Sequence, residues 1–351
     1  SSNAQDGVSS VQTAEGALTE VHSMLQRMNE LATQAANGTN SADDRSAIQD
    51  EVDQLTTEID RVAETTKFNE IYLLKGDDSS TKNVYMKGHD AGLKGSLTDG
   101  AKTATFMMDT LKEGDQYTIA GKEYTIGSAQ GDLEALIDKA DKELTAAAAG
   151  TKDVEIDGKK YTLTYKAGGN TIADADGNAV ADLATLKGKI AAGSKVTYGN
   201  TTLTAMNDVN GDGVDDDDDS IITTAVAKSK IKAELVTANN IGTTDHAATV
   251  ADGVDDAAGK TSYTITKGYA TVANTLSFNL HVGADADMTN KINVSIDTMN
   301  SSNLGIKNLN VTDGTGTAAT YAIDAIADAV SKVSSQRSAL GAVQNRLEHT
   351  I

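Results

Sequence analysis

The residues best suited to chemistry lie in one acidic stretch, "DVNGDGVDDDDD", which runs from Asp208 to Asp219. Residues with side-chain oxygens occupy alternate positions, as in an EF-hand-like calcium loop, because such a loop must wrap around a hard cation. Gly213 allows the sharp bend that this wrapping requires. The expected ligands are Asp208, Asn210, Asp212, the Val214 carbonyl, Asp216 and Asp219.

The alternative to a calcium site is a solvated acidic loop, since blocks of like charge usually stay disordered. The closing residue of the loop is also aspartate where the motif usually has glutamate, which shortens its reach for bidentate binding. Ca²⁺ is therefore the one cofactor that the sequence suggests, and the sequence requires none.

No arrangement of residues indicates catalysis. Five histidines are scattered along the chain, and none forms the H-E-x-x-H pair of a zinc hydrolase. The nucleophile-elbow pattern G-x-S-x-G is missing too. The stretch from Gly253 to Thr261, "GVDDAAGKT", imitates a phosphate loop but has five residues between its glycines where the motif needs four. We therefore expect that the protein is not an enzyme.

Composition narrows the range of partners. The chain has 351 residues, a net charge of −21 and a sequence pI near 4.5. An acidic field repels phosphate, so we expect no binding to nucleic acid or to membranes. With 4% aromatic residues, large aromatic-lined pockets are not expected. No apolar run approaches the ~20 residues needed to span a bilayer.

Apolar residues near the amino terminus recur at spacings of three and four, a pattern typical of a coiled-coil seam. Gly38 ends this first helix, and Ser41 with Asp44 forms a capping box that starts a second, antiparallel helix. A third helix is predicted from about residue 321 to 349. The three predicted seams are Val11, Ala14, Leu18, Val21, Leu25, Met28, Ala32 and Ala35; Ile48, Val52, Leu55, Ile59 and Val62; and Ile323, Ile326, Val330, Val333, Leu340, Val343 and Leu347.

These helices can bury their seams only against one another, because most of the stability of a long helix comes from packing its apolar face. We therefore predict an α+β fold with a long antiparallel helical rod bundle built from both chain ends and an inserted β-hairpin/helix outer region. The predicted rod domain is discontinuous, comprising residues 5–100 and 277–351 with a short β-hairpin element. Residues 101–276 form the variable outer α+β region of one or two subdomains, and residues 1–4 read as a tag remnant.

The outer region shows a loose repeat of hairpin followed by helix. "YTIAGKEYTI" from Tyr117 precedes a predicted helix at about 131–147, and "VEIDGKKYTL" from Val154 precedes one at about 178–191. Asp157 with Gly158 is a strong signal for a tight turn. "KVTYGNTTLT" from Lys195 starts a third copy, with its helix delayed to about 220–237. "TSYTITKGYATV", from Thr261, is predicted to form another hairpin.

Three stretches resemble bacterial flagellin: "DGVSSVQTAEGALTEVHSMLQRMNELATQAANGTNS", "EIDRVAETTKFNEIYLL" and "LGAVQNRLEHTI". The resemblance covers about residues 5–76 and 278–351. Glu70 departs from it, since the family usually has glycine after "FN". The resemblance implies an exported, extracellular filament subunit whose full-length form uses a flagellar export chaperone. It also implies that terminal polymerisation helices are absent here, so we expect this fragment to be a monomer.

The resemblance further implies a surface for the innate immune receptor Toll-like receptor 5 on the first helices. The matching residues are Arg27, Leu31 and Glu51, with Gln26, Glu30, Gln34 and Ile48 beside them. Arg27 and Leu31 stand four positions apart, which places them on one helical face. The alternatives are a surface ion pair between Arg27 and Glu51 without a binding role, and use of the same face in filament packing.

Two hypotheses follow. The first is a structural subunit of the flagellar filament, a motility protein whose rod is a ligand for Toll-like receptor 5. The second keeps the rod as a scaffold that displays a calcium-stabilised adhesive or ligand-binding outer domain.

Overall fold

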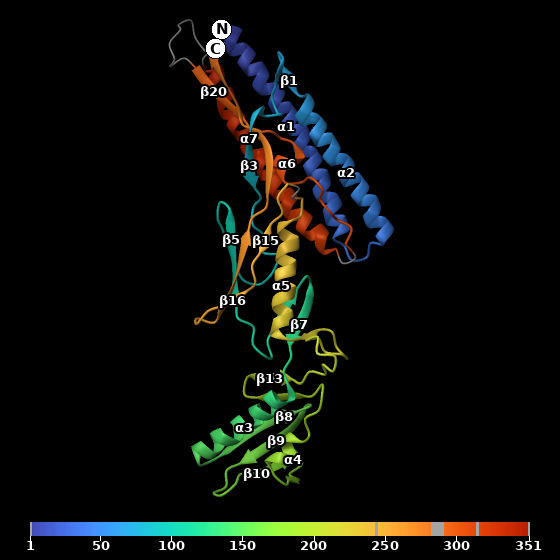
Figure 1. Ribbon diagram of the computed structural model, residues 1–351, viewed down its shortest axis with the longest axis vertical. Helices are drawn as coiled ribbons and strands as arrows, with labels where there is room; N and C mark the ends of the chain where they lie inside the picture. Colours follow the sequence, from blue (N-terminus) through green and yellow to red (C-terminus); the bar gives the residue numbers. More distant parts are fainter. Residues whose placement is uncertain (1, 243–244, 282–290, 314–315, 350–351) are drawn as a thin grey trace.

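The computed structural model describes residues 2–242, 245–281, 291–313 and 316–349. It is an elongated molecule that combines long helices at one end with several small sheets at the other (Figure 1). Its helices are α1 (Ser2–Ala35), α2 (Ala42–Thr65), α3 (Gln130–Ala147), α4 (Leu183–Lys187), α5 (Thr224–Asn239), α6 (Ser301–Leu304) and α7 (Thr317–Glu348).

The three longest helices, α1, α2 and α7, lie side by side (Figure 1). α1 contacts both α2 and α7, and the two chain ends lie at the same end of the molecule. All eight predicted seam residues of α1 are no more than 1% exposed, from Val11 to Ala35. They share one hydrophobic cluster with seam residues of the other two helices, such as Ile59 in α2 and Val333 in α7. The first and last parts of the chain therefore bury their apolar faces together.

The start of α2 has the predicted capping box. The Ser41 hydroxyl accepts a hydrogen bond from the backbone N–H of Asp44, and the Asp44 carboxylate accepts one from the backbone N–H of Ser41. This exchange satisfies two backbone donors that a helix start otherwise leaves unpaired. Arg45 adds a tie across the turn, since its guanidinium donates to the carbonyls of Ala35 and Asn37. The α1–α2 connection is thus fixed by its own polar residues.

Short strands make up most of the remaining regular structure. They are β1 (Lys67–Phe68), β2 (Ile71–Tyr72), β3 (Asp77–Tyr85), β4 (Ser96–Asp99), β5 (Thr103–Asp109), β6 (Gln116–Ile119), β7 (Lys122–Ile126), β8 (Thr151–Ile156), β9 (Lys159–Thr164), β10 (Thr171–Asp174), β11 (Ala179–Val180), β12 (Lys195–Tyr198), β13 (Thr201–Thr204), β14 (Ile221–Ile222), β15 (Thr249–Val250), β16 (Val254–Asp255), β17 (Lys260–Thr266), β18 (Tyr269–Asn274), β19 (Leu276–His281) and β20 (Lys291–Ile296).

Within the described residues, these strands form six sheets. β1–β2, β18–β3 and β19–β20 are two-stranded, and β14–β7–β6 is three-stranded. A five-stranded sheet has the order β15–β17–β5–β4, with β16 also paired to β17, and a six-stranded sheet has the order β11–β10–β9–β8–β12–β13. The β3–β18 ribbon lies between the long helices and the outer sheets (Figure 1).

The predicted hairpins β6–β7, β8–β9 and β12–β13 all form. Asp157 and Gly158 both have positive φ angles, +52° and +79°, in the β8–β9 turn, as expected for a tight two-residue turn. The helix predicted at about 131–147 is α3, which packs on the six-stranded sheet. The helix predicted at about 220–237 begins at Thr224 as α5. The turn and helix signals of the outer region were therefore read correctly at these places.

Two predictions for the outer region were wrong. "TSYTITKGYATV" is not a hairpin, because β17 pairs with β5 while β18 pairs with β3 in another sheet. The helix predicted at about 178–191 is reduced to α4, and β11 occupies its first residues. β17 and β18 have strand partners that are distant in the sequence, whereas β11 pairs with its neighbour β10 across a short turn.

One of the predicted domain limits, at residue 100, separates two strands that pair with each other. β4 ends at Asp99 and pairs with β5, which begins at Thr103, so the limit predicted at residue 100 lies inside the five-stranded sheet. The described residues form three further hydrophobic clusters besides that of the long helices, and all three lie mainly in the outer region. Within the described residues, no helix combines the length and apolarity needed to cross a membrane.

Candidate functional site

Arg27 is the centre of a polar cluster on the exposed side of α1. Its guanidinium contacts Glu51 of α2, with Nη2 2.8 Å and Nε 2.9 Å from Oε1, and Glu30 one turn later, with Nη1 3.2 Å from Oε2. The Arg27 and Glu51 side chains are 48% and 42% exposed. Hydrogen bonding to Glu51, and then to Glu30, raises the pKa of Arg27 above its ordinary value. The cluster is thus a charged, oriented surface that bridges two helices.

Gln26 and Gln34 lie exposed on the same helix, as expected. Gln26 and Glu30 also line a groove between α1 and α7, with Ile326 and Val330 on the α7 side. We name Gln26, Arg27, Glu30, Gln34 and Glu51 the Arg27 face.

Leu31 and Ile48 do not belong to this face, contrary to the sequence-based expectation. Leu31 is 2% exposed and Ile48 is 5% exposed, and both lie in the core shared by the long helices. Four residues advance a helix by about 400°, so Leu31 is rotated by roughly 40° from Arg27 around the axis, enough to bury it. These two residues support the face from below and offer no apolar contact to a partner.

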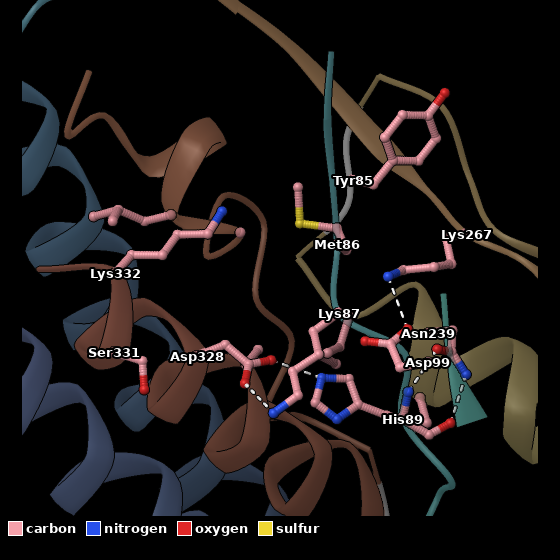
Figure 2. A pocket seen from close by; sticks show the side chains of 15 residues that line it. Tyr85, Met86, Lys87, His89, Asp99, Asn239, Lys267, Asp328, Ser331 and Lys332 are labelled. Carbon is pink, nitrogen blue, oxygen red and sulfur yellow. Dashed lines mark hydrogen bonds and ion pairs between the residues drawn. The ribbon is translucent and has the colours of Figure 1, made fainter. Parts of the chain in front are cut away.

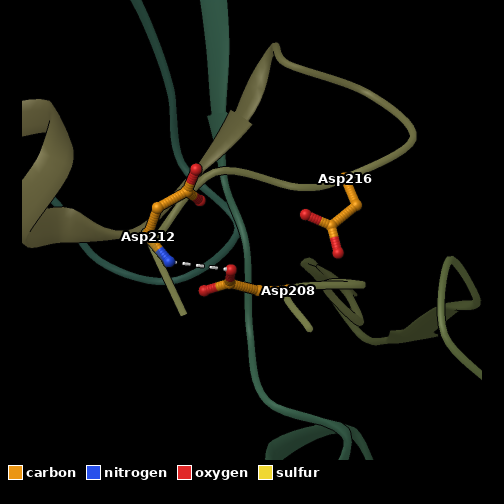
Figure 3. Close-up of side chains that lie close together, drawn as sticks. All are labelled: Asp208, Asp212 and Asp216. Carbon is orange, nitrogen blue, oxygen red and sulfur yellow. Dashed lines mark hydrogen bonds between the residues drawn. The ribbon is translucent and has the colours of Figure 1, made fainter. Parts of the chain in front are cut away.

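The acidic loop brings three of its predicted ligands together. One ligand oxygen from each of Asp208, Asp212 and Asp216 lies within 4.8 Å of the others (Figure 3). Backbone N–H groups hold these carboxylates: Asp208 accepts from Asp212 and Gly213, and Asp216 accepts from Val209. Three carboxylates at this separation could ligate one hard cation such as Ca²⁺.

The other predicted ligands lie differently. Asp219 pairs with Lys122, with 2.7 Å between Oδ1 and Nζ, and is not in the group of three. The Asn210 side chain accepts a hydrogen bond from the Asp212 N–H, and Val214 forms a β-bridge with Ile222. The closing position of the predicted loop is therefore engaged with a lysine, which the sequence did not indicate because Lys122 is far away along the chain.

Gly213 is required by its surroundings. Its φ is +80°, and a Cβ there would come within 2.7 Å of Val226 and 2.8 Å of the Thr223 hydroxyl. Sequence reasoning missed Asp215, which is 6% exposed and organises the loop. Its carboxylate accepts from the N–H groups of Asn207, Asp217 and Asp218. Nothing in the run of five aspartates distinguishes this one.

A further pocket lies where the outer region meets α7 (Figure 2). Its volume is about 320 Å³, and its lining includes residues of β3, β4, α5, α6 and α7. His89 Nε2 lies 2.8 Å from Asp328 Oδ2, and Lys267 Nζ lies 2.8 Å from Asp99 Oδ1. We name it the joint pocket. No sequence pattern predicts this pocket, because its polar residues come from five separate segments.

The segment from Gly253 to Thr261, which resembles a phosphate-loop motif in sequence, does not adopt the strand–loop–helix structure of such a loop. Gly253 precedes β16, and Lys260 begins β17, where a phosphate loop would be followed by a helix. Lys260 pairs with Asp109, and Asp255 pairs with Lys228.

Comparison with known proteins identifies the class to which these long helices belong. Residues 1–79 match the family model "Bacterial flagellin N-terminal helical region". A flagellin of Clostridium tyrobutyricum is 33% identical over 356 residues, an alignment that covers all of this chain and 70% of that protein. Phase 2 flagellin of Salmonella typhimurium is 36% identical over 190 residues, covering 51% of this chain and 37% of that one.

The chain therefore belongs to the flagellin family, whose members are structural proteins of the exported, extracellular flagellar filament. Among solved structures, FliC from Burkholderia pseudomallei matches 97% of this chain and 99% of its own, with 21% identity and a TM-score of 0.35. The flagellar junction protein FlgL from Legionella pneumophila matches 99% and 94%, with 15% identity and the same score.

Proposed function

We propose that this chain is a filament subunit whose Arg27 face is a ligand surface for Toll-like receptor 5. The single observation that supports it best is the double anchoring of Arg27 by Glu30 and Glu51. An arginine held in one orientation loses less side-chain entropy on binding than a free one. Arginine is also among the residues that most often dominate interface energetics.

The proposed face is polar. Because Leu31 and Ile48 are buried, and Ile326 is itself only 1% exposed, the apolar contact must come mainly from the half-buried Val330 in the groove beside Gln26 and Glu30. A partner would thus contact α1, α2 and α7 together, and only the packed bundle offers this surface. In the intact protein, neighbouring filament subunits and the receptor would compete for this surface. We propose a flagellar export chaperone as a further partner of the full-length chain.

This function can be tested by measuring the affinity of the chain for the receptor ectodomain and comparing the Arg27→Ala and Arg61→Ala variants. Arg61 is the matched control, because it is also exposed on the long helices and pairs with a glutamate, Glu58, at 2.9 Å. We expect Arg27→Ala to weaken binding by about tenfold or more and Arg61→Ala to leave it nearly unchanged. Equal affinity of both variants and the parent would remove the proposal.

A second proposed function is display of a calcium-stabilised adhesive or ligand-binding outer domain, favoured by the approach of Asp208, Asp212 and Asp216. A cation that binds only the folded loop raises stability with its concentration. We expect the outer region to unfold at a higher temperature in excess Ca²⁺ than in chelator. Asp212→Asn should abolish this difference. Asp176→Asn should keep it, because Asp176 lies in an exposed turn between β10 and β11 of the six-stranded sheet, which we name the distal sheet. Identical midpoints in calcium and chelator would contradict the site.

A further inference from the structure

The joint pocket is lined by a buried lysine, Lys267, and a half-buried lysine, Lys332, and only the first has an ion-pair partner among the described residues. The Lys267 side chain is 7% exposed and is neutralised by Asp99 at 2.8 Å, with a second hydrogen bond to the Gly100 carbonyl. Lys332 of α7 is half-buried and donates to the Asn303 carbonyl at 2.6 Å. Within the described part of the chain, no carboxylate oxygen lies within 4 Å of Lys332 Nζ. Lys332 is therefore a lysine without an ion-pair partner beside an open cavity.

The surroundings of Lys332 shift its protonation equilibrium toward the neutral amine. Burial lowers the pKa of Lys332, and the positive charge of Lys82 acts in the same direction. Asp297 and Asp328 oppose this shift but do not overcome it. A neutral lysine amine carries the lone pair that makes lysine a nucleophile, whereas the ammonium form does not.

Access to the amine comes from the pocket itself. Lys332 lines it together with Met86, Leu304 and Asp328. Figure 2 shows the amine extending from α7 toward the side on which Met86 lies. A volume of about 320 Å³ is at the lower end of the range for small-molecule sites, so only a small reagent fits.

We infer that Lys332 is a covalent modification site that reacts with small aldehydes entering the joint pocket. The nitrogen lone pair forms a bond to the carbonyl carbon, and both amine hydrogens leave with the carbonyl oxygen as water. The product is an imine, and no oxidant or reductant takes part.

This inference can be tested by treating the whole chain with acetaldehyde in the presence of sodium cyanoborohydride, which traps any imine that forms. The reductant converts each imine to an ethylated amine, which peptide mass spectrometry locates. At pH 7 we expect the labelled fraction to be largest at Lys332, smaller at the exposed Lys307 and smallest at Lys267. Lys267 is the matched control, since it lines the same pocket but is ion-paired.

The pH dependence separates a neutral amine from mere accessibility. Near pH 10 a large share of ordinary lysines is also neutral, so the excess at Lys332 over Lys307 should shrink. Lower labelling of Lys332 than of Lys307 at pH 7 would overturn the inference. An excess that is the same at both pH values would overturn it as well, because it would reflect access alone.

Two substitutions shift the expected labelling in opposite directions. Asp328→Asn removes a charge that favours the ammonium form, so labelling of Lys332 at pH 7 should rise. Lys82→Gln removes a charge that disfavours the ammonium form, so labelling should fall. Lys82 pairs with Asp297 and not with His89 or Asp328, so its variant keeps the test valid if Asp328→Asn unfolds. No change in either folded variant would contradict the inference.

Discussion

The long helices and the outer region fix their functional surfaces by different means. In the helices, the Arg27 face is supported by side chains that are almost fully buried, such as Leu25 and Met28 at 0% exposure. In the outer region, the acidic loop is held by carboxylates such as Asp208 and Asp215, which accept hydrogen bonds from backbone N–H groups. Packing makes the first surface depend on the whole bundle, whereas a charged loop responds to ions around it.

The largest effects should come from cavities, and they should stay on the side where the cavity is made. Leu18 in α1 and Leu163 in β9 are both 0% exposed but belong to separate hydrophobic clusters. Each substitution to alanine should cost about 2–5 kcal/mol. Chemical denaturation monitored by hydrogen exchange should assign the loss from Leu18→Ala to the long helices and that from Leu163→Ala to the distal sheet. Equal losses in both regions for each variant would mean that the two clusters unfold as one.

The acidic loop should be sensitive to a single methyl group at Gly213. Gly213→Ala forces a residue with a side chain into a left-handed conformation and overpacks Val226 and Thr223. We expect a cost of about 2–4 kcal/mol from strain and overpacking together. Gly211→Ala is the control, because its φ is +73° but its Cβ would face open space, so about 1 kcal/mol is expected. Thermal unfolding of both variants measures these costs. Equal losses of stability in the two variants would show that the packing contact at Gly213 is unimportant.

A gain in stability is expected at the β1–β2 hairpin. Glu70 has a φ of +69°, which is unfavourable for a residue with a Cβ. Glu70→Gly should stabilise the hairpin by about 1 kcal/mol. Asn69→Gly, at a φ of +46°, should give less, since asparagine tolerates this conformation. Urea denaturation can rank the two variants, and a loss of stability in Glu70→Gly would contradict the strain argument.

The smallest expected effect is a pH dependence at Asp297. Burial raises the pKa of Asp297, but hydrogen bonds from Lys82, at 2.6 Å, and Thr275 outweigh burial, so the pKa is lowered overall. A lowered carboxyl pKa contributes stability above the unfolded pKa of about 4 that is lost as the pH falls through the folded value. Because Asp297 is 43% exposed, we expect less than about 1 kcal/mol. Asp297→Asn should flatten this acid-side loss in denaturation curves measured at several pH values.

The seams of the long helices were predictable because a helix that repeats its apolar residues every three or four positions has one face to bury. Local turn chemistry was equally readable at Asp157 and Gly158. The pairing of β17 and β18 was not, because their partners β5 and β3 come from more than 150 residues earlier in the chain. Strand pairing across such distances leaves no signal in adjacent residues.

The candidate sites divide in the same way. The spacing of Asp208, Asp212 and Asp216 predicted a cluster that forms. Asp219 does not join it, because it pairs with Lys122 of the β6–β7 hairpin. Helical spacing put Leu31 near Arg27, yet the angle between them was enough to bury Leu31 in the core shared by the long helices. Spacing therefore predicted the aspartate cluster, the resemblance to flagellin suggested the Arg27 face, and tertiary contacts decided which of the predicted residues lie together.

The central claim is that α1 and α2 depend on α7, so that the Arg27 face exists only in the packed bundle. The most direct test is hydrogen exchange on the full chain and on a form that lacks residues 317–351. We expect the amides of α1 and α2 to lose nearly all protection in the shortened form, while those of the six-stranded sheet keep theirs. Unchanged protection of α1 and α2 without α7 would contradict the account.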